Sequence, residues 1–103
     1  MANFDKIMKQ AARMQQQLAE VQSELANRLI EGSSGGGAVK VTGKADGSIV
    51  GIKIDPQVVS AGDVSMLEDL VLSAVKQTIE RAREEQNRET SRITGGMSIP
   101  GIM

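Results

Sequence analysis

Residues 39–54 read VKVTGKADGSIVGIKI, and this stretch decides the fold. On both sides of Asp46-Gly47, apolar residues alternate with other residues, a period of two that is typical of a strand with one buried face. An Asp-Gly pair between two such runs is a strong local signal for a hairpin. The stretch therefore predicts two antiparallel strands, with an apolar face made of Val39, Val41, Val50, Ile52 and Ile54.

The residues just before this hairpin leave two interpretations open. Leu29-Ile30-Glu31 is too short to classify alone, so it either adds a third strand or belongs to a connection. Residues 32–37 read GSSGGG, and such a run predicts a flexible connection. It is not a phosphate-binding P-loop, because Ala38 stands where that motif requires lysine.

A long helix is predicted before the sheet, from residue 3 to about residue 29. Its apolar residues recur in alternating steps of three and four, the a/d seam of a heptad repeat, and Asn3 can cap its start. At about 1.5 Å per residue the helix is roughly 40 Å long, so we expect it to project beyond the core or to pack along another long helix. The seam consists of Phe4, Ile7, Ala11, Met14, Leu18, Val21 and Leu25.

A second long helix is predicted after Pro56 ends the last strand. It begins near Asp63 or Ser65, where Ser65 and Glu68 have the spacing of a capping box, and Thr94-Gly95-Gly96 ends it. We therefore expect one domain over residues 1–94 and a flexible C-terminal tail over residues 95–103. The predicted core-facing stripe of this helix is Leu67, Leu70, Val71, Ala74, Val75, Thr78, Ile79 and Ala82.

Composition excludes most kinds of catalytic and metal site. The 103 residues contain no Cys and no His, which removes thiolate ligands, cysteine nucleophiles and histidine acid–base chemistry together. The neighbouring acids Glu68/Asp69 and Glu84/Glu85 point in different directions on a helix, so neither pair makes a catalytic dyad. We expect a protein that is not an enzyme, with no cofactor, no metal and no small-molecule substrate.

Apolar content predicts a protein outside the membrane that pairs with itself. No apolar run approaches the roughly 20 residues that span a bilayer, and residues 1–9 do not resemble a signal peptide. A cytoplasmic location is therefore expected. Phe4 is the only aromatic residue, and because so small a chain leaves much surface wet, a homodimer would help to close its core.

Charge placement predicts where an anionic partner would bind. The net charge is only −1, so any interface must depend on local clusters. Lys6, Lys9 and Arg13 line one side of the first helix near its N-terminus, where cations oppose the helix dipole; a solvated face is the alternative. If the two long helices pack antiparallel, this cluster lies beside a second set near the end of the other helix, made of Arg81, Arg83, Arg88 and Arg92.

The sequence resembles the YbaB/EbfC family along nearly its whole length. The resemblance rests on several short motifs in a fixed order: MKQA at 8–11, MQ at 14–15, GGGAVKV at 35–41, IKIDP at 52–56, MLEDL at 66–70, TGGM at 94–97 and IPG at 99–101. It implies an α+β fold of the α-β-β-β-α type, with a small antiparallel sheet and two long helices. It also implies a tweezer-shaped homodimer in the bacterial nucleoid that binds DNA with its helical arms.

The function expected from the sequence is thus non-enzymatic binding of double-stranded DNA. Without stacking aromatic residues or a base-reading motif, the contacts should go mainly to phosphates and show little sequence preference. The candidate contacts are the seven cations of the two clusters. The alternative is a protein-interaction, chaperone-like or ribosome-associated factor that uses the heptad seam and does not bind DNA physiologically.

Overall fold

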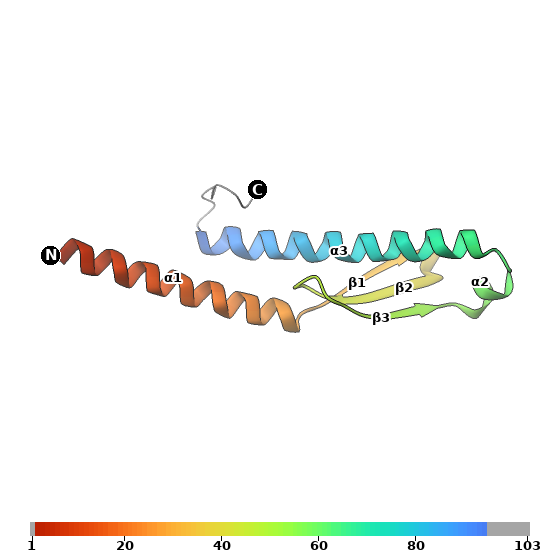
Figure 1. Cartoon of the computed structure of the whole chain (residues 1–103), viewed down its shortest axis with the longest axis horizontal. Helices are drawn as coiled ribbons and strands as arrows, with labels where there is room; N and C mark the ends of the chain where they lie inside the picture. Colours follow the sequence, from red (N-terminus) through yellow and green to blue (C-terminus); the bar gives the residue numbers. More distant parts are fainter. Residues whose placement is uncertain (1, 95–103) are drawn as a thin grey trace.

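A computed structural model describes residues 2–94 and confirms the α+β fold (Figure 1). A long helix leads into a three-stranded antiparallel sheet, and a second long helix runs back over the sheet. The expected tail at residues 95–103 lies outside the described residues. The elements are α1 (Ala2–Asn27), β1 (Leu29–Ser34), the 3-10 turn η1 (Gly35–Gly37), β2 (Val39–Lys44), β3 (Ile49–Ile54), α2 (Pro56–Ser60) and α3 (Val64–Thr94).

The predicted hairpin is β2 and β3, and it is confirmed. The strands pair antiparallel, with Val41 opposite Ile52 and a bulge near Gly43. In the turn, Gly47 has a φ of 98°, which favours glycine. The Asp46 carboxylate accepts hydrogen bonds from the hydroxyl and the amide of Ser48, at 2.6 and 2.9 Å. These bonds stabilise the ionised form and lower the pKa of Asp46.

The third strand of the sheet is longer than the sequence suggested. Gly32, Ser33 and Ser34 belong to β1, so the expectation of a connection is wrong for residues 32–34, while residues 35–37 form the turn η1 between β1 and β2. The physical reason lies in α3, which holds these residues in place. Ser34 donates its hydroxyl proton to the carbonyl oxygen of Leu70 at 2.6 Å, and the amide of Ser33 donates to Gln77 Oε1 at 2.7 Å.

The main core lies between α3 and the first two strands. Val39 and Val41 of β2 are fully buried against Ala74 of α3. Thr78 is buried beside them and donates its hydroxyl proton to the carbonyl oxygen of Ala74 at 2.8 Å. The predicted stripe on α3 is therefore largely right, but Ile79 is exposed.

Strand β3 is left largely uncovered because α3 packs on β1 and β2. Ile52 points to the α3 side of the sheet, opposite Val41, yet 48% of it is exposed. Val50 is exposed too, whereas Ile54 is partly buried against the core, so the single chain covers only one end of the apolar face of β3.

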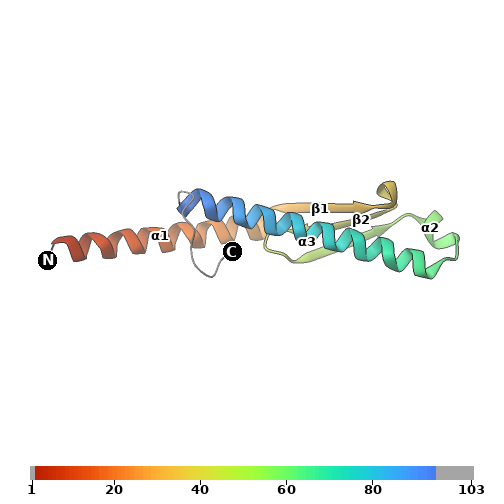
Figure 2. The same cartoon turned by 90° about the horizontal axis from the view of Figure 1, so that it is seen from above.

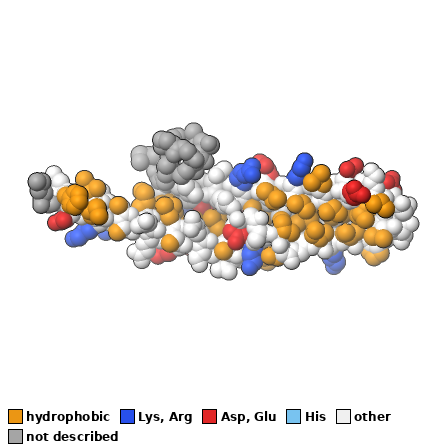
Figure 3. Space-filling model, viewed as in Figure 1, with side chains coloured by type: hydrophobic (Ala, Val, Ile, Leu, Met, Phe, Trp, Pro, Cys, Tyr) orange, Lys and Arg blue, Asp and Glu red, His pale blue; other side chains and the backbone are white. Residues whose placement is uncertain are grey.

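One side of α3 continues this exposed apolar surface. Leu72, Ile79 and Gln86 recur every seven residues and so share a side of the helix. Gln86 donates to the carbonyl oxygen of Ala45, beside the β2–β3 turn, which places that side next to β3. Figure 3 shows hydrophobic side chains gathered over this region. The α3–β3 flank consists of Ile49, Val50, Ile52, Leu72 and Ile79.

Helix α1 packs with only its second half and then projects. Val21 and Leu25 are buried with Ala45, and Ile93 from the end of α3 packs against them. Beyond that point the N-terminal part of α1 extends past the end of α3 (Figure 1), in a molecule whose extents are 72 × 23 × 16 Å. Asn3 lies inside the helix rather than at its cap.

The start of α3 confirms Asp63, one of the two predicted starts. Asp63 Oδ1 accepts the amide proton of Met66 at 3.0 Å, so Asp63 is the capping residue. Ser65 and Glu68 lie within the helix, and the expected capping box between them is wrong. The short helix α2, which the sequence analysis did not predict, begins after Asp55, whose carboxylate accepts the amide proton of Gln57 at 2.9 Å.

The close contact between β1 and α3 yields the first prediction. A Cβ atom on Gly32 would lie 2.2 Å from Thr78 Oγ1 and 2.7 Å from the carbonyl oxygen of Ala74. Because the backbone of α3 would have to move, we expect Gly32→Ala to lower the free energy of unfolding by about 1–3 kcal/mol. Urea denaturation would measure the change. Gly51→Ala is the matched control, since a Cβ there meets nothing within 4 Å; equal losses in both variants would contradict this explanation.

Candidate nucleic-acid interface

Helix α1 carries a basic face on its projecting part. Lys6, Lys9 and Arg13 are exposed, and none of them forms an ion pair or hydrogen bond with another residue in the range 2–94. Steps of three and four place the three side chains on one side of the helix. They stand near the helix N-terminus, where the dipole disfavours cations, so an external anion would relieve an unfavourable arrangement.

The basic face of α1 is opposite to its apolar seam. At 100° per residue, Lys6, Lys9 and Arg13 point about half a turn away from Phe4 and Ile7. Figure 3 shows hydrophobic side chains on one side of the projecting part and Lys and Arg on the other. The same seam turns Val21 and Leu25 inward toward α3 and Ala45. The basic face therefore points away from α3 and is open to a large partner.

The arginines of α3 are engaged within the chain. Arg88 pairs with Glu85 at 2.7 Å, and Arg92 pairs with Glu89 at 2.5 Å. Arg81 donates to the carbonyl oxygen of Glu31 at 2.5 Å, which holds α3 on β1. Within the described part of the chain, Arg83 alone of the four has no such partner. Two of the four arginines in the second predicted cluster are thus paired with acids, and a third is hydrogen-bonded to the backbone.

The structure does not join the two predicted clusters into one arm. Because Ile93 packs at Val21 and Leu25, the end of α3 lies beside the second half of α1 and not beside its start. Lys6 and Lys9 therefore lie on helix that has no α3 alongside it (Figures 1 and 2). We conclude that the projecting arm is α1 alone.

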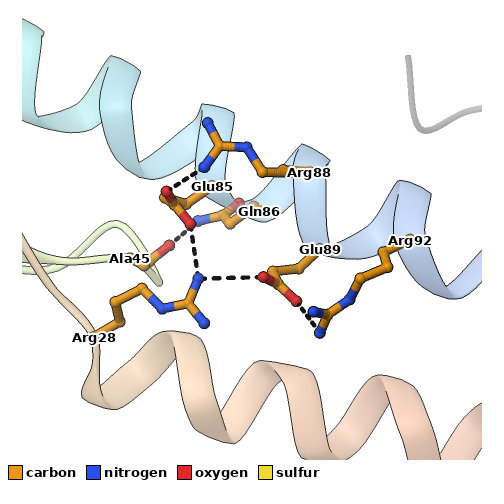
Figure 4. A network of polar contacts seen from close by, with 7 residues as sticks. All are labelled: Arg28, Ala45, Glu85, Gln86, Arg88, Glu89 and Arg92. Atoms are coloured by element: carbon orange, nitrogen blue, oxygen red, sulfur yellow. Dashed lines mark hydrogen bonds and ion pairs between the residues drawn. The ribbon is translucent and has the colours of Figure 1, made fainter.

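An ion-pair network fixes the angle between this arm and α3 (Figure 4). Arg28 follows α1 directly, and its Nη1 lies 2.7 Å from Glu85 Oε2 and 3.3 Å from Glu89 Oε1. The hydrogen bonds that Arg28 donates, first to Glu85 and then to Glu89, raise the pKa of its guanidinium. Glu89 is only 7% exposed, and its ion pairs with Arg28 and Arg92 offset the cost of burying it.

The sequence analysis did not predict this network. Arg28 and Glu85 are 57 residues apart, and no local spacing relates them. The only available signal was a run of glutamates between the arginines of α3, which the sequence analysis treated as pairs along one helix. Two of those glutamates, Glu85 and Glu89, also bind Arg28, which lies outside α3.

A metal cluster and a membrane-spanning helix are both absent from the described residues. Residues 2–94 contain no group of three or more acidic side chains placed to hold a metal ion. Within the same range, neither long helix has a stretch apolar enough to cross a bilayer.

Known proteins resemble this chain over nearly its full length. The model of the YbaB/EbfC DNA-binding family matches residues 1–97. A nucleoid-associated protein of Moorella thermoacetica is 46% identical over 99% of this chain and 98% of its own. One of Clostridium perfringens is 47% identical, covering 99% of this chain and 91% of its own. These names describe DNA binding and nucleoid association and not an enzymatic activity, which confirms the expectation of a non-enzymatic protein.

A solved structure supports the fold alone. The uncharacterized protein HP0035 from Helicobacter pylori matches with a TM-score of 0.80 and 18% identity. The match covers 89% of this chain and 97% of that one.

The Arg28 network yields the second prediction. Arg28→Gln removes the cation that links α1 to Glu85 and Glu89, so we expect severalfold faster amide exchange in residues 21–27 of α1. Exchange in β2 should not change, because Val39 and Val41 lie in a separate core cluster. Hydrogen–deuterium exchange with mass spectrometry would measure both. Arg83→Gln is the control, and the same effect in that variant would show that the network does not hold α1.

Proposed function

This chain belongs to the YbaB/EbfC DNA-binding family, and from that membership we propose that it binds double-stranded DNA in the bacterial nucleoid. The observation that carries the proposal is the basic face of α1, formed by Lys6, Lys9 and Arg13 on a helix that projects from the body of the molecule. Binding is mainly to phosphates and shows little sequence preference. A homodimer presents two such arms.

Contact with phosphates fits the side chains that this face offers. Lys6 and Arg13 are about 10 Å apart along the helix axis, so the three cations can follow the backbone of one strand. Lysine acts on phosphate as a compact charge, and Phe4, the chain's only aromatic residue, points to the other side of the helix. The face can therefore neutralise a backbone, and it lacks the aromatic platform on which unpaired bases stack.

The arginines of α3 have a secondary role in this proposal. Arg81, Arg83, Arg88 and Arg92 were all candidate contacts in the sequence. A guanidinium has five N–H donors, so an arginine that already binds a glutamate can still reach a phosphate. The neighbouring glutamates repel the same phosphate, however, and we therefore assign the larger share of the affinity to α1.

The α3–β3 flank supports the homodimer. It is a continuous apolar surface on which Ile52 is 48% exposed and Leu72 is 53% exposed. β3 is also an edge strand, whose free N–H and C=O groups can pair with another chain. Covering this flank with the same flank of a second copy would bury its apolar side chains and satisfy the edge. We propose that the dimer forms here.

The dimer surface yields the third prediction. Ile52→Glu combined with Leu72→Glu places charge in the α3–β3 flank, so we expect the mass in solution to fall from that of two chains to that of one. Light scattering coupled to gel filtration would measure it, and circular dichroism would check folding. The control is Val59→Glu, an exposed apolar residue of α2 away from the flank. A wild-type protein that is monomeric at micromolar concentration would refute the proposed dimer.

The basic face yields the fourth prediction. Replacing Lys6, Lys9 and Arg13 together with Glu should abolish measurable DNA binding, because six acids per dimer would then face the phosphates. These side chains are solvated, so the change in unfolding free energy should stay within about 0.5 kcal/mol for each. Fluorescence anisotropy with a labelled duplex would measure affinity. Lys44→Glu with Lys53→Glu, on the sheet, is the control; if that variant loses binding instead, the site is the sheet.

Salt dependence gives the fifth prediction. If roughly four to six phosphates are neutralised per dimer, log affinity should fall against log salt with a slope near −0.9 for each phosphate. Affinity should differ little between duplexes of unrelated sequence. The same anisotropy assay at several salt concentrations measures both. An affinity insensitive to salt, or a strong preference for one sequence, is incompatible with contacts made mainly to phosphates.

A further inference from the structure

The projecting part of α1 has an apolar seam that no other part of residues 2–94 covers. Phe4 and Ile7 are 64% and 62% exposed, and Met14 is exposed as well. In the second half of the same helix the seam is used, since Val21 and Leu25 are buried. One heptad pattern thus runs through the whole helix, and only half of it meets a partner within the described residues.

The residues that flank the naked seam are uncharged. In a coiled coil the e and g positions border the seam and set partner choice by their charges. With Phe4 at position a, these positions hold Met8, Gln10, Gln15 and Gln17. The charged residues of this part, which are Asp5, Lys6, Lys9 and Arg13, fall at positions b, c and f on the outer side. An identical helix could therefore approach without bringing like charges together.

We propose that this naked seam, formed by Phe4, Ile7, Ala11 and Met14, binds the same seam of α1 in a second copy that belongs to a neighbouring dimer. The alternating steps of three and four are the pattern that a partner helix fits. Ala11 stands at the centre of the four, and its small side chain lets two helix backbones come close. A second copy is favoured as the partner because it presents an identical apolar seam bordered by uncharged residues, so the two helices can pair without repulsion between like charges.

The contact should be weak by itself. Only two heptads of each helix take part, with four seam residues of which one is Ala, so the contact buries little apolar surface. The α3–β3 flank is therefore the surface that holds the primary dimer, and the seam links dimers. It does not require DNA, but DNA would strengthen it, because two dimers bound side by side raise each other's effective concentration. Binding along a duplex then becomes cooperative.

Cross-linking through a single introduced cysteine tests the contact. The chain has no Cys, so Ala11→Cys provides the only thiol, and a short bismaleimide joins two chains where seams meet. Ala12→Cys, one residue along at position b, is the matched control. We expect Ala11→Cys to cross-link much faster than Ala12→Cys, and faster still on a duplex long enough for several dimers. Equal rates would overturn the proposal and leave the seam to another occupant, such as residues 97–103.

The size of the cross-linked product separates a link between dimers from a link within one. Under native conditions we expect a mass of four chains or more. A product with the mass of the unmodified dimer would mean that the two arms of one dimer close on each other, and this would also overturn the proposal. Both readouts can be made without DNA, so a failure here is distinguishable from a failure of DNA binding.

A second pair of variants tests the consequence on DNA. Ile7→Gln with Met14→Gln makes the seam polar and keeps residues that favour helix, while Lys6, Lys9 and Arg13 remain. We expect loss of cooperativity on a long duplex with unchanged affinity for a duplex that holds one dimer. Ala12→Gln is the control and should keep the cooperativity. Unchanged cooperativity in the seam variant would contradict the proposal, as would an equal loss in the control.

Discussion

The close approach of α3 to the sheet is the constraint on which the other features depend. Gly32 of β1 and Gly43 of β2 both face Thr78, and a Cβ on Gly43 would lie 3.0 Å from Thr78 Cγ2. Because neither glycine has a side chain, the backbone of α3 at Thr78 can approach β1 and β2 closely. With its axis fixed there, α3 covers β1 and β2 and cannot also cover β3. The exposure of the α3–β3 flank and the position at which α3 ends beside α1 both follow from this close contact.

The chain uses its cations for two different purposes. Arg28, which follows α1, binds Glu85 and Glu89 of α3 and so links the two helices, while Arg88 and Arg92 pair with the same two glutamates within α3. Lys6 and Lys9, farther out, meet no acid among the described residues. Although the net charge is only −1, the charges are unevenly distributed. Ion pairs lie near the body of the molecule, and unpaired cations lie on the projecting helix.

Sequence reasoning succeeded where the determining interactions are local. The alternation around Asp46-Gly47 predicted the hairpin, and the periodic apolar residues predicted both long helices to within a few residues. It failed where a distant element decides the conformation. Ser33 and Ser34 form a strand because Gln77 and Leu70 bind them from α3, and a glycine–serine run carries no local sign of this.

The candidate site was predictable to a similar extent. The three- and four-residue steps of Lys6, Lys9 and Arg13 were sufficient to place them on one face of a helix. Their separation from the arginines of α3 was not predictable, because it depends on where α3 ends along α1. The packing of Ile93 against Val21 and Leu25 determines where α3 ends along α1. A contact between residues so far apart in the sequence leaves no local pattern that could predict it.

The length of α1 beyond its attachment makes it a lever. Its 26 residues span about 39 Å, and within residues 2–94 it is attached only through its second half, at Val21, Leu25 and the adjoining Arg28. A rotation of about 10° there would carry the far tip through about 7 Å for a rod of that length. Small rearrangements among a few side chains near residue 28 are therefore magnified into large displacements of Lys6, and the reach of the basic face is set at the opposite end of the helix from the cations themselves.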